Sequence, residues 1–201
     1  MEKSIQLKPA IQKAISYKDY LNLTEVLLSE GKTTGPNQSE DYLHYTNLNF
    51  HRMKRLDKTV ELNEDLKSLL QAIEKPQTWL VISEAWCGDA AQNVPILQKM
   101  AAQNQLIDLK IILRDENLDV MDLYLTKGGR SIPKLIALEN ETFNEIFTWG
   151  PRPAVIQEVM NQLKEENITE LSVMVEKIQI AYNYDKSQSI QEEFKAILTS
   201  L

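Results

Sequence analysis

Between residues 76 and 165 the chain alternates short apolar runs with amphipathic segments, and this order restricts the fold more than any other feature. The runs at 79–83 and 109–113 have the length of strands, and segments with helical periodicity follow them at 88–102 and near 120–125. Parallel strands need a long crossover connection, so this pattern predicts two parallel strands joined through a helix.

Two further strand-like runs follow Pro133, at 134–138 and 143–149, and a short polar link separates them. Such a link between two strands is typical of an antiparallel hairpin. Pro153 is placed to begin a last helix, because proline is favoured in the first turn of a helix. The predicted order is therefore strand, helix, strand, helix, strand, strand, helix, and it is complete by Glu165.

The segments on either side of this unit have helical patterns. We expect helices at 17–30, 39–58, 63–74, 168–182 and 189–198. Ser189 and Glu192 predict a capping box at the start of the last one. The predicted fold class is α/β, a central mixed β-sheet flanked by helices. We divide the chain into an N-terminal helical extension (1–75), the α/β unit (76–165) and a C-terminal helical extension packing on the same body (166–201).

The composition is that of a folded globular protein, with 43% hydrophobic and 25% charged residues in a chain of 201. The net charge of −7 argues against binding to nucleic acid or to an anionic membrane surface. Residues 1–6 do not begin a secretory signal, and no apolar run is long enough to cross a membrane. We therefore expect a cytoplasmic protein without nucleic-acid or membrane partners.

The single cysteine, Cys87, lies where the first strand meets the following helix. One cysteine excludes a disulfide within the chain, so any redox chemistry needs another molecule. A cysteine in the first turn of a helix meets unpaired N–H groups and the positive end of the helix dipole, which favour the thiolate. Asp89 opposes this effect by charge repulsion, so we expect only a moderately lowered pKa for Cys87.

Four features of the α/β unit resemble the thioredoxin family in order and spacing. Trp-Cys-Gly-Asp-Ala occupies 86–90, Pro95 lies in the following helix, Arg-Ser-Ile-Pro occupies 130–133, and Gly150 follows the last strand. The resemblance, to bacterial cytosolic thioredoxin-like proteins, covers 76–165 and implies a thioredoxin-like fold.

The resemblance also implies roles for the site residues. Cys87 is then the catalytic nucleophile, and Pro133 is in the cis form beside it, which exposes the backbone of Ile132 to an extended substrate segment. The residues that the family pattern assigns to substrate binding are Trp86, Gly88, Asp89, Ile132, Pro133 and Gly150.

Two positions depart from the family pattern. Ala90 occupies the place of the second, resolving cysteine, so the chain cannot complete a dithiol cycle by itself. Val81 occupies the strand position where thioredoxins commonly bury an aspartate that assists proton transfer.

Two charged residues are candidates for electrostatic modulation of Cys87. Glu84 could partly substitute for the missing aspartate, although an exposed glutamate at the strand end is the favoured interpretation. Arg130 could offset the charge of Asp89 if the Pro133 loop lies against Cys87.

We expect no catalytic or metal-binding role for the other polar residues. His44 and His51 lie on one predicted helix with no carboxylate between them at ligand spacing, so we expect no metal site. The basic run at 52–55 is interpreted as a solvated helix face that could dock an acidic partner. No resident cofactor is implied.

The leading hypothesis is monothiol exchange, in which Cys87 attacks a disulfide or oxidised thiol of a partner protein. An external low-molecular-weight thiol such as glutathione then resolves the adduct. The alternatives are a non-catalytic thioredoxin-fold binding module and a redox sensor that forms an intermolecular disulfide. A thiol pKa below about 7 favours exchange, and a value above about 8 favours the binding module.

Overall fold

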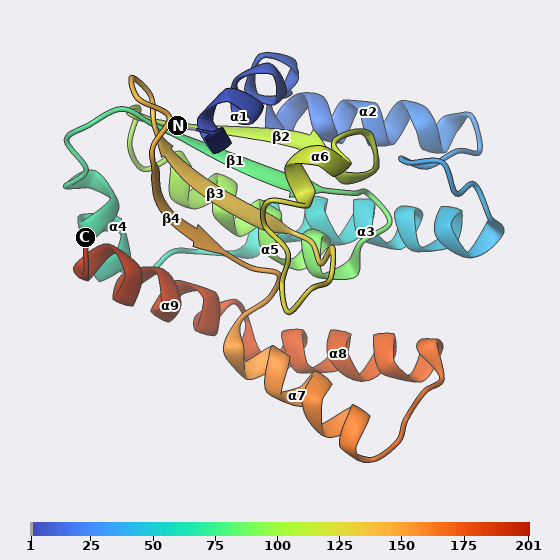
Figure 1. Ribbon diagram of the computed structural model, residues 1–201. Helices are drawn as coiled ribbons and strands as arrows, with labels where there is room; N and C mark the ends of the chain where they lie inside the picture. The colour runs from blue at the N-terminus through green and yellow to red at the C-terminus, as the bar shows by residue number, and fades with distance from the viewer. Residues whose placement is uncertain (1) are drawn as a thin grey trace.

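The computed structural model describes residues 2–201, with side chains from Gln6 onward, so Met1 lies outside the described part. Its centre is a four-stranded mixed sheet between helices (Figure 1). The strands are β1 (Gln77–Ser83), β2 (Ile107–Leu113), β3 (Lys134–Glu139) and β4 (Glu145–Trp149), arranged in the order β2-β1-β3-β4. The parallel pair β1–β2 and the antiparallel hairpin β3–β4 are both as the alternating pattern predicted.

Strand β1 is central because both of its neighbours pair with it along nearly its whole length. All of its residues are buried, which is typical of a strand covered by helices on both faces. Val81 pairs with Ile111 on one side and with Leu135 on the other. Ile15 adds an isolated antiparallel bridge to Ile111 at the outer edge of β2.

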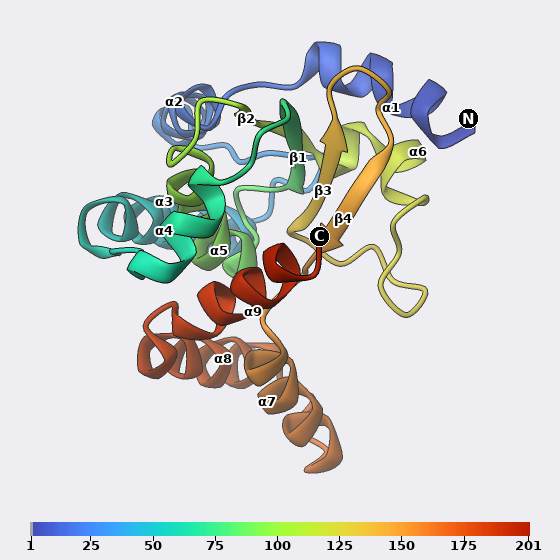
Figure 2. The same ribbon diagram turned by 90° about the vertical axis from the view of Figure 1, so that its left-hand side faces the viewer.

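The helices cover both faces of the sheet. Helix α5 lies on one face with α3 outside it, whereas α1 and α6 lie on the opposite side (Figure 2). The helices are α1 (Glu2–Lys13), α2 (Tyr17–Ser29), α3 (Glu40–Thr59), α4 (Glu64–Gln71), α5 (Gly88–Ala101), α6 (Leu118–Met121), α7 (Ala154–Glu165), α8 (Leu171–Asp185) and α9 (Gln188–Thr199), with a 3-10 turn at Arg114–Glu116. The fold class is therefore as predicted, with helical extensions at both ends.

Two features of the helices differ from the sequence prediction. Helix α1 was not expected, because Pro9 lies inside it and proline disfavours a helix interior. Its Leu7 nevertheless packs into the main core. The predicted capping box of α9 is wrong: Ser189 lies in the first turn, and its hydroxyl donates to the Asp185 carboxylate.

The apolar core has two parts. The main part joins the sheet to helices from both ends of the chain, and Phe194 of α9 packs against the rings of Trp79, Phe147 and Trp149. A smaller cluster holds α7 against α8, and these two helices form a hairpin that projects from the body (Figures 1 and 2). The hairpin is thus packed mainly on itself, whereas α9 is anchored in the main core.

We predict that Phe194→Ala lowers the free energy of unfolding by about 3–5 kcal/mol, because it removes a fully buried ring from an aromatic cluster. Tyr184→Ala is the matched control, since that side chain is 83% exposed, and its effect should stay within about 0.5 kcal/mol. Urea unfolding followed by circular dichroism measures both. Equal effects of the two substitutions would contradict the described anchoring of α9.

Candidate functional site

Cys87 is the residue that caps the N-terminus of α5. Its Sγ accepts a hydrogen bond from the Ala90 N–H at 3.4 Å, and its thiol donates to the carbonyl oxygen of Ile132 at 3.3 Å. The Ile132–Pro133 peptide is cis, as the family resemblance implied. The motif and the Pro133 loop are therefore brought together, and the cysteine lies between them with 9% of its surface exposed.

The protonation of Cys87 differs from the sequence expectation. Burial, and to a smaller extent the nearby charge of Asp89, raise the pKa of its thiol to about 12. The N–H groups of Ala90 and Asp89 and the charge of Arg152 lower it, but by less. The predicted lowering of the pKa is wrong because desolvation outweighs the helix N-terminus. The thiol is neutral near pH 7, in agreement with its hydrogen bond to a carbonyl oxygen.

Asp89 forms a buried network with residues from the C-terminal part of the chain. Its carboxylate pairs with Arg152 at 2.5 Å and accepts a hydrogen bond from the Tyr182 hydroxyl at 2.8 Å. Asn93 donates to that hydroxyl at 2.9 Å. Burial raises the pKa of Asp89, and both of its partners lower it. Sequence reasoning missed Arg152 and Tyr182, which lie 63 and 93 positions from Asp89 and carry no motif.

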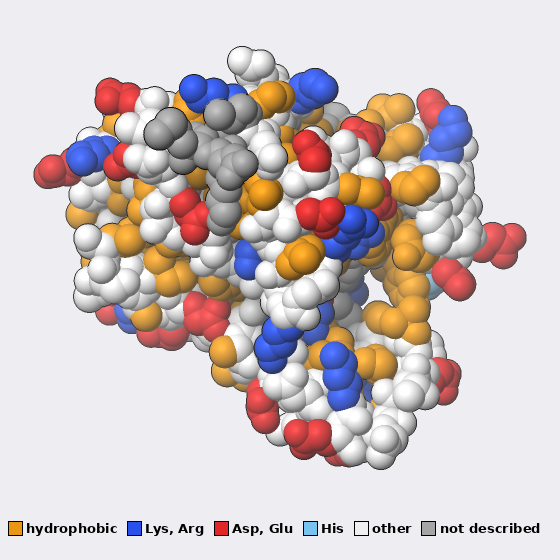
Figure 3. Space-filling view, in the orientation of Figure 1, with side chains coloured by type: hydrophobic (Ala, Val, Ile, Leu, Met, Phe, Trp, Pro, Cys, Tyr) orange, Lys and Arg blue, Asp and Glu red, His pale blue; other side chains and the backbone are white. Residues whose placement is uncertain are grey.

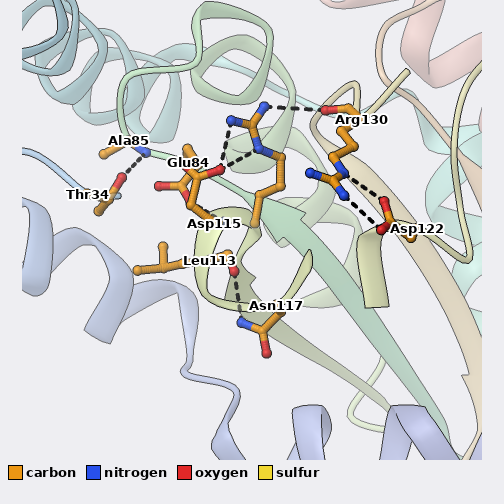
Figure 4. A network of polar contacts seen from close by, with 9 residues as sticks. Thr34, Glu84, Ala85, Leu113, Asp115, Asn117, Asp122 and Arg130 are labelled. Carbon is orange, nitrogen blue, oxygen red and sulfur yellow. Dashed lines mark hydrogen bonds and ion pairs between the residues drawn. The ribbon is translucent and has the colours of Figure 1, made fainter. Parts of the chain in front are cut away.

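Arg130 does not offset Asp89, contrary to the expectation. Its guanidinium forms an exposed ion pair with Asp122 at 2.6 Å (Figure 4). Its carbonyl oxygen accepts a hydrogen bond from Arg114 at 3.3 Å. The position next to Asp89 is occupied by Arg152 instead.

Glu84 is fully buried rather than exposed at the strand end. Its Oε1 accepts from the Asp115 N–H at 2.9 Å, and the Thr34 hydroxyl beside it accepts from the Ala85 N–H at 3.0 Å (Figure 4). Burial raises the pKa of Glu84, whereas hydrogen bonds from Thr34 and Asp115 lower it. Glu84 therefore links the loops of Thr34 and Asp115 to the turn before Cys87.

Trp86 is held between two side chains at the edge of the site. The Arg114 guanidinium lies 4.7 Å from its ring centre, and the Tyr42 ring lies 4.9 Å away in a tilted contact. A cation over the face of a tryptophan ring is favourable, so this arrangement fixes the indole beside Cys87.

A groove of about 320 Å³ opens above the motif, between α3 and the α7–α8 hairpin. In Figure 3 hydrophobic side chains gather along the hollow between the main body and the hairpin. The lining residues are Tyr42, Tyr45, Leu48, Asn49, Arg52, Trp86, Cys87, Gly88, Asp89, Arg152, Met160, Leu171, Met174, Val175, Ile178 and Gln179. Arg52, interpreted from the sequence as part of a solvated face, is half-buried here.

The predicted substrate-binding residues separate into two groups. Trp86, Gly88 and Asp89 line the groove with Cys87, whereas Ile132, Pro133 and Gly150 do not. Their backbone edge is therefore not the surface that the groove presents.

The backbone of the cis-proline loop is buried and already hydrogen-bonded within the protein. Ile132 and Pro133 are buried, and the Ile132 carbonyl already accepts the Cys87 thiol. Gly150 has φ 112°, and a Cβ there would lie 2.3 Å from the Pro133 carbonyl oxygen. The expected exposure of the Ile132 backbone to an extended segment is thus wrong for this arrangement.

Helix α8 rests on the start of α5. A Cβ at Gly88 would lie 2.8 Å from Nε2 of Gln179, and Gln92 donates to the side-chain oxygen of Gln179 at 2.7 Å. The absence of a side chain at Gly88 therefore allows the close approach of α8. Helix α8 of the C-terminal extension thus packs directly against the motif at Gly88.

The remaining candidates stay outside the site. His44 and His51 are exposed on α3, and among the side chains of residues 6–201 no three or more potential ligands are grouped so as to hold a metal ion. Val81 is fully buried in the sheet. Within the described part of the chain, no helix is long and apolar enough to span a membrane.

Comparisons with known proteins decide the family. A family model described as thioredoxin matches residues 35–167, which is more than half of the chain. The chain belongs to the thioredoxin family. The matched residues include α3 and α4 as well as the sheet.

Two solved structures of similar fold cover nearly the whole chain of this thioredoxin-family protein. A protein of unknown function from Pseudomonas aeruginosa has a TM-score of 0.55 and 20% identity, over 92% of this chain and 98% of that one. An HIV epitope-scaffold has a TM-score of 0.53 and 20% identity, over 93% and 99%. Both likenesses concern the fold, and no curated protein matches the chain.

We predict that the stability of this protein falls at alkaline pH partly through Cys87. Below pH 9.0, the ordinary pKa of the thiol, it is protonated in both the folded and the unfolded protein. Between pH 9.0 and about 12 only the unfolded chain loses the proton. From about pH 8 to 10 the wild type should lose about 1 kcal/mol more than Cys87→Ala. Urea unfolding at both pH values measures the difference, and identical pH dependence of the two proteins would contradict a buried neutral thiol.

Proposed function

We propose that this thioredoxin-family protein is a binding protein whose ligand site is the groove above the Trp-Cys-Gly-Asp turn. The observation that carries the proposal is that Cys87 lines the groove as a buried, neutral thiol. The raised pKa of the Cys87 thiol supports the binding module over exchange.

The chemistry of Cys87 supports binding over exchange. Because the pKa of the thiol is raised to about 12, almost none of it is ionised near pH 7, and the thiolate is the attacking species. Ala90 cannot resolve a mixed disulfide, and α8 packs closely against the motif at Gly88. In the described arrangement Cys87 therefore contributes to the lining of the groove.

The groove has the features of a small-molecule site. Small-molecule sites are typically concave, mostly apolar, and provided with a few polar groups that fix the orientation of the ligand. Here α3 and the α7–α8 hairpin supply apolar walls, and Arg52 and Arg152 are the cationic side chains among the lining residues.

We predict that Cys87 of the native protein reacts with iodoacetamide near pH 7 on the order of 100-fold more slowly than an exposed thiol, since it is neutral and covered. The control is Ser29→Cys in a Cys87→Ser background, because Ser29 is exposed on α2. Mass spectrometry follows the reaction, and urea should abolish the protection. Equal rates for the two native thiols would overturn the proposal.

Monothiol exchange is the second candidate, and the position of the sulfur favours it. Cys87 caps α5 beside the cis Pro133, which is the placement that the family resemblance implied for a nucleophile. Exchange requires α8 to move and expose the thiol to a partner protein disulfide in the cytoplasm, with glutathione as the resolving thiol. The wild type should then reduce a glutathionylated protein, and Cys87→Ser should not; equal, negligible turnover rejects this candidate.

A further inference from the structure

We propose that the groove beside Cys87 binds a small carboxylate with an apolar body, and that Arg52 binds its carboxylate. The proposal rests on the binding function proposed above and names the class of ligand. The observations that support it are the walls, the charges and the unpaired donors of the groove.

The walls fit an apolar ligand body. Leu48 of α3 faces the groove together with Leu171, Met174, Val175 and Ile178 of α8. Leu48 is 44% exposed and Leu171 is 65% exposed, so apolar surface at the groove remains in contact with solvent. A volume of about 320 Å³ lies at the lower end of the range for small-ligand sites. Burial of this surface by an apolar ligand is favourable.

Arg52 supplies a positive charge that no carboxylate of residues 6–201 balances. Its Nη1 donates to Oδ1 of Asn49 at 2.5 Å, and Asn49 in turn donates to the Ala85 carbonyl oxygen at 3.0 Å. The guanidinium is thereby fixed in orientation. Among the described side chains no carboxylate lies within ion-pair distance of Arg52. Partial burial of an unbalanced cation favours an anionic ligand.

The other charges at the groove cancel. Arg152 pairs with Asp89, so Arg52 leaves a net positive charge among the lining residues. Both carboxylate oxygens of Asp89 are engaged, one by Arg152 and one by Tyr182. The Asp89 carboxylate is therefore already paired within the protein, so it is not available to bind a cationic group of a ligand.

Two buried donors support the same class of ligand. Nε of Arg152 and Nε1 of Trp86 have no acceptor among the described residues, and both side chains line the groove. A buried N–H without an acceptor is costly, so an acceptor that reaches it is stabilising. With Arg52, three of the side chains that line the groove carry N–H donors, and a carboxylate supplies acceptors only.

A small molecule fits these observations better than a peptide. An extended peptide in a thioredoxin fold would pair with the backbone before the cis-proline, and that backbone is buried here. The groove is instead lined by side chains of α3, the motif and the α7–α8 hairpin.

The test compares octanoate with octanamide, its uncharged analogue, by isothermal titration of the full-length protein near pH 7.5. Octanoate should bind about tenfold more tightly, because a hydrogen-bonded ion pair is added. Arg52→Gln should abolish this preference, and Arg52→Lys should retain part of it. Arg55→Gln is the matched control, since Arg55 is exposed on the same helix and does not line the groove.

Each outcome has a defined meaning. Equal affinities for octanoate and octanamide would overturn the carboxylate assignment and leave groove binding intact. Binding of neither compound, with Cys87 still protected from iodoacetamide, would overturn the ligand class, whereas rapid alkylation would contradict the proposed function itself. Tighter binding of an apolar peptide with a free C-terminus than of octanoate would overturn the assignment to a small molecule.

Discussion

The buried ion pair between Asp89 and Arg152 joins two parts of the chain that are distant in sequence, and the closed form of the site depends on it. Asp89 belongs to the motif at the start of α5, and Arg152 precedes the α7–α8 hairpin. Tyr182 adds a hydrogen bond from α8 to the same carboxylate. Removal of one partner would leave an uncompensated buried charge, at a cost of about 3–5 kcal/mol. The pair therefore holds the hairpin over the motif and defines one wall of the groove.

The same closure explains why a thioredoxin-type placement of the cysteine does not produce a thioredoxin-type thiol. A helix N-terminus stabilises a nearby negative charge by at most about 2 kcal/mol. A rise in pKa from 9.0 to about 12 corresponds to about 4 kcal/mol against the thiolate. Burial and the charge of Asp89 therefore outweigh the helix N-terminus, and Cys87 lines the groove as a neutral thiol.

The sequence predicted those elements whose signals are local. Strand β1 and the β3–β4 hairpin follow from short apolar runs, and the position of Cys87 follows from the junction of strand and helix. Features that depend on distant partners were missed. Glu84 is buried because Thr34 and Asp115 approach it from other loops, and Arg152 has its role only because the chain returns to Asp89. Helical periodicity likewise could not show that Arg52 is partly buried.

Ionisation of Cys87 is the property that most directly tests whether the thiol is buried and neutral. The chemical shift of a ¹³C-labelled Cys87 Cβ, followed by nuclear magnetic resonance during a pH titration of the folded protein, reports the protonation of the thiol without a reagent that must reach it. We expect no ionisation up to about pH 10, since the pKa is raised to about 12. A midpoint below about 7 would contradict the raised pKa of Cys87 and would indicate a reactive monothiol.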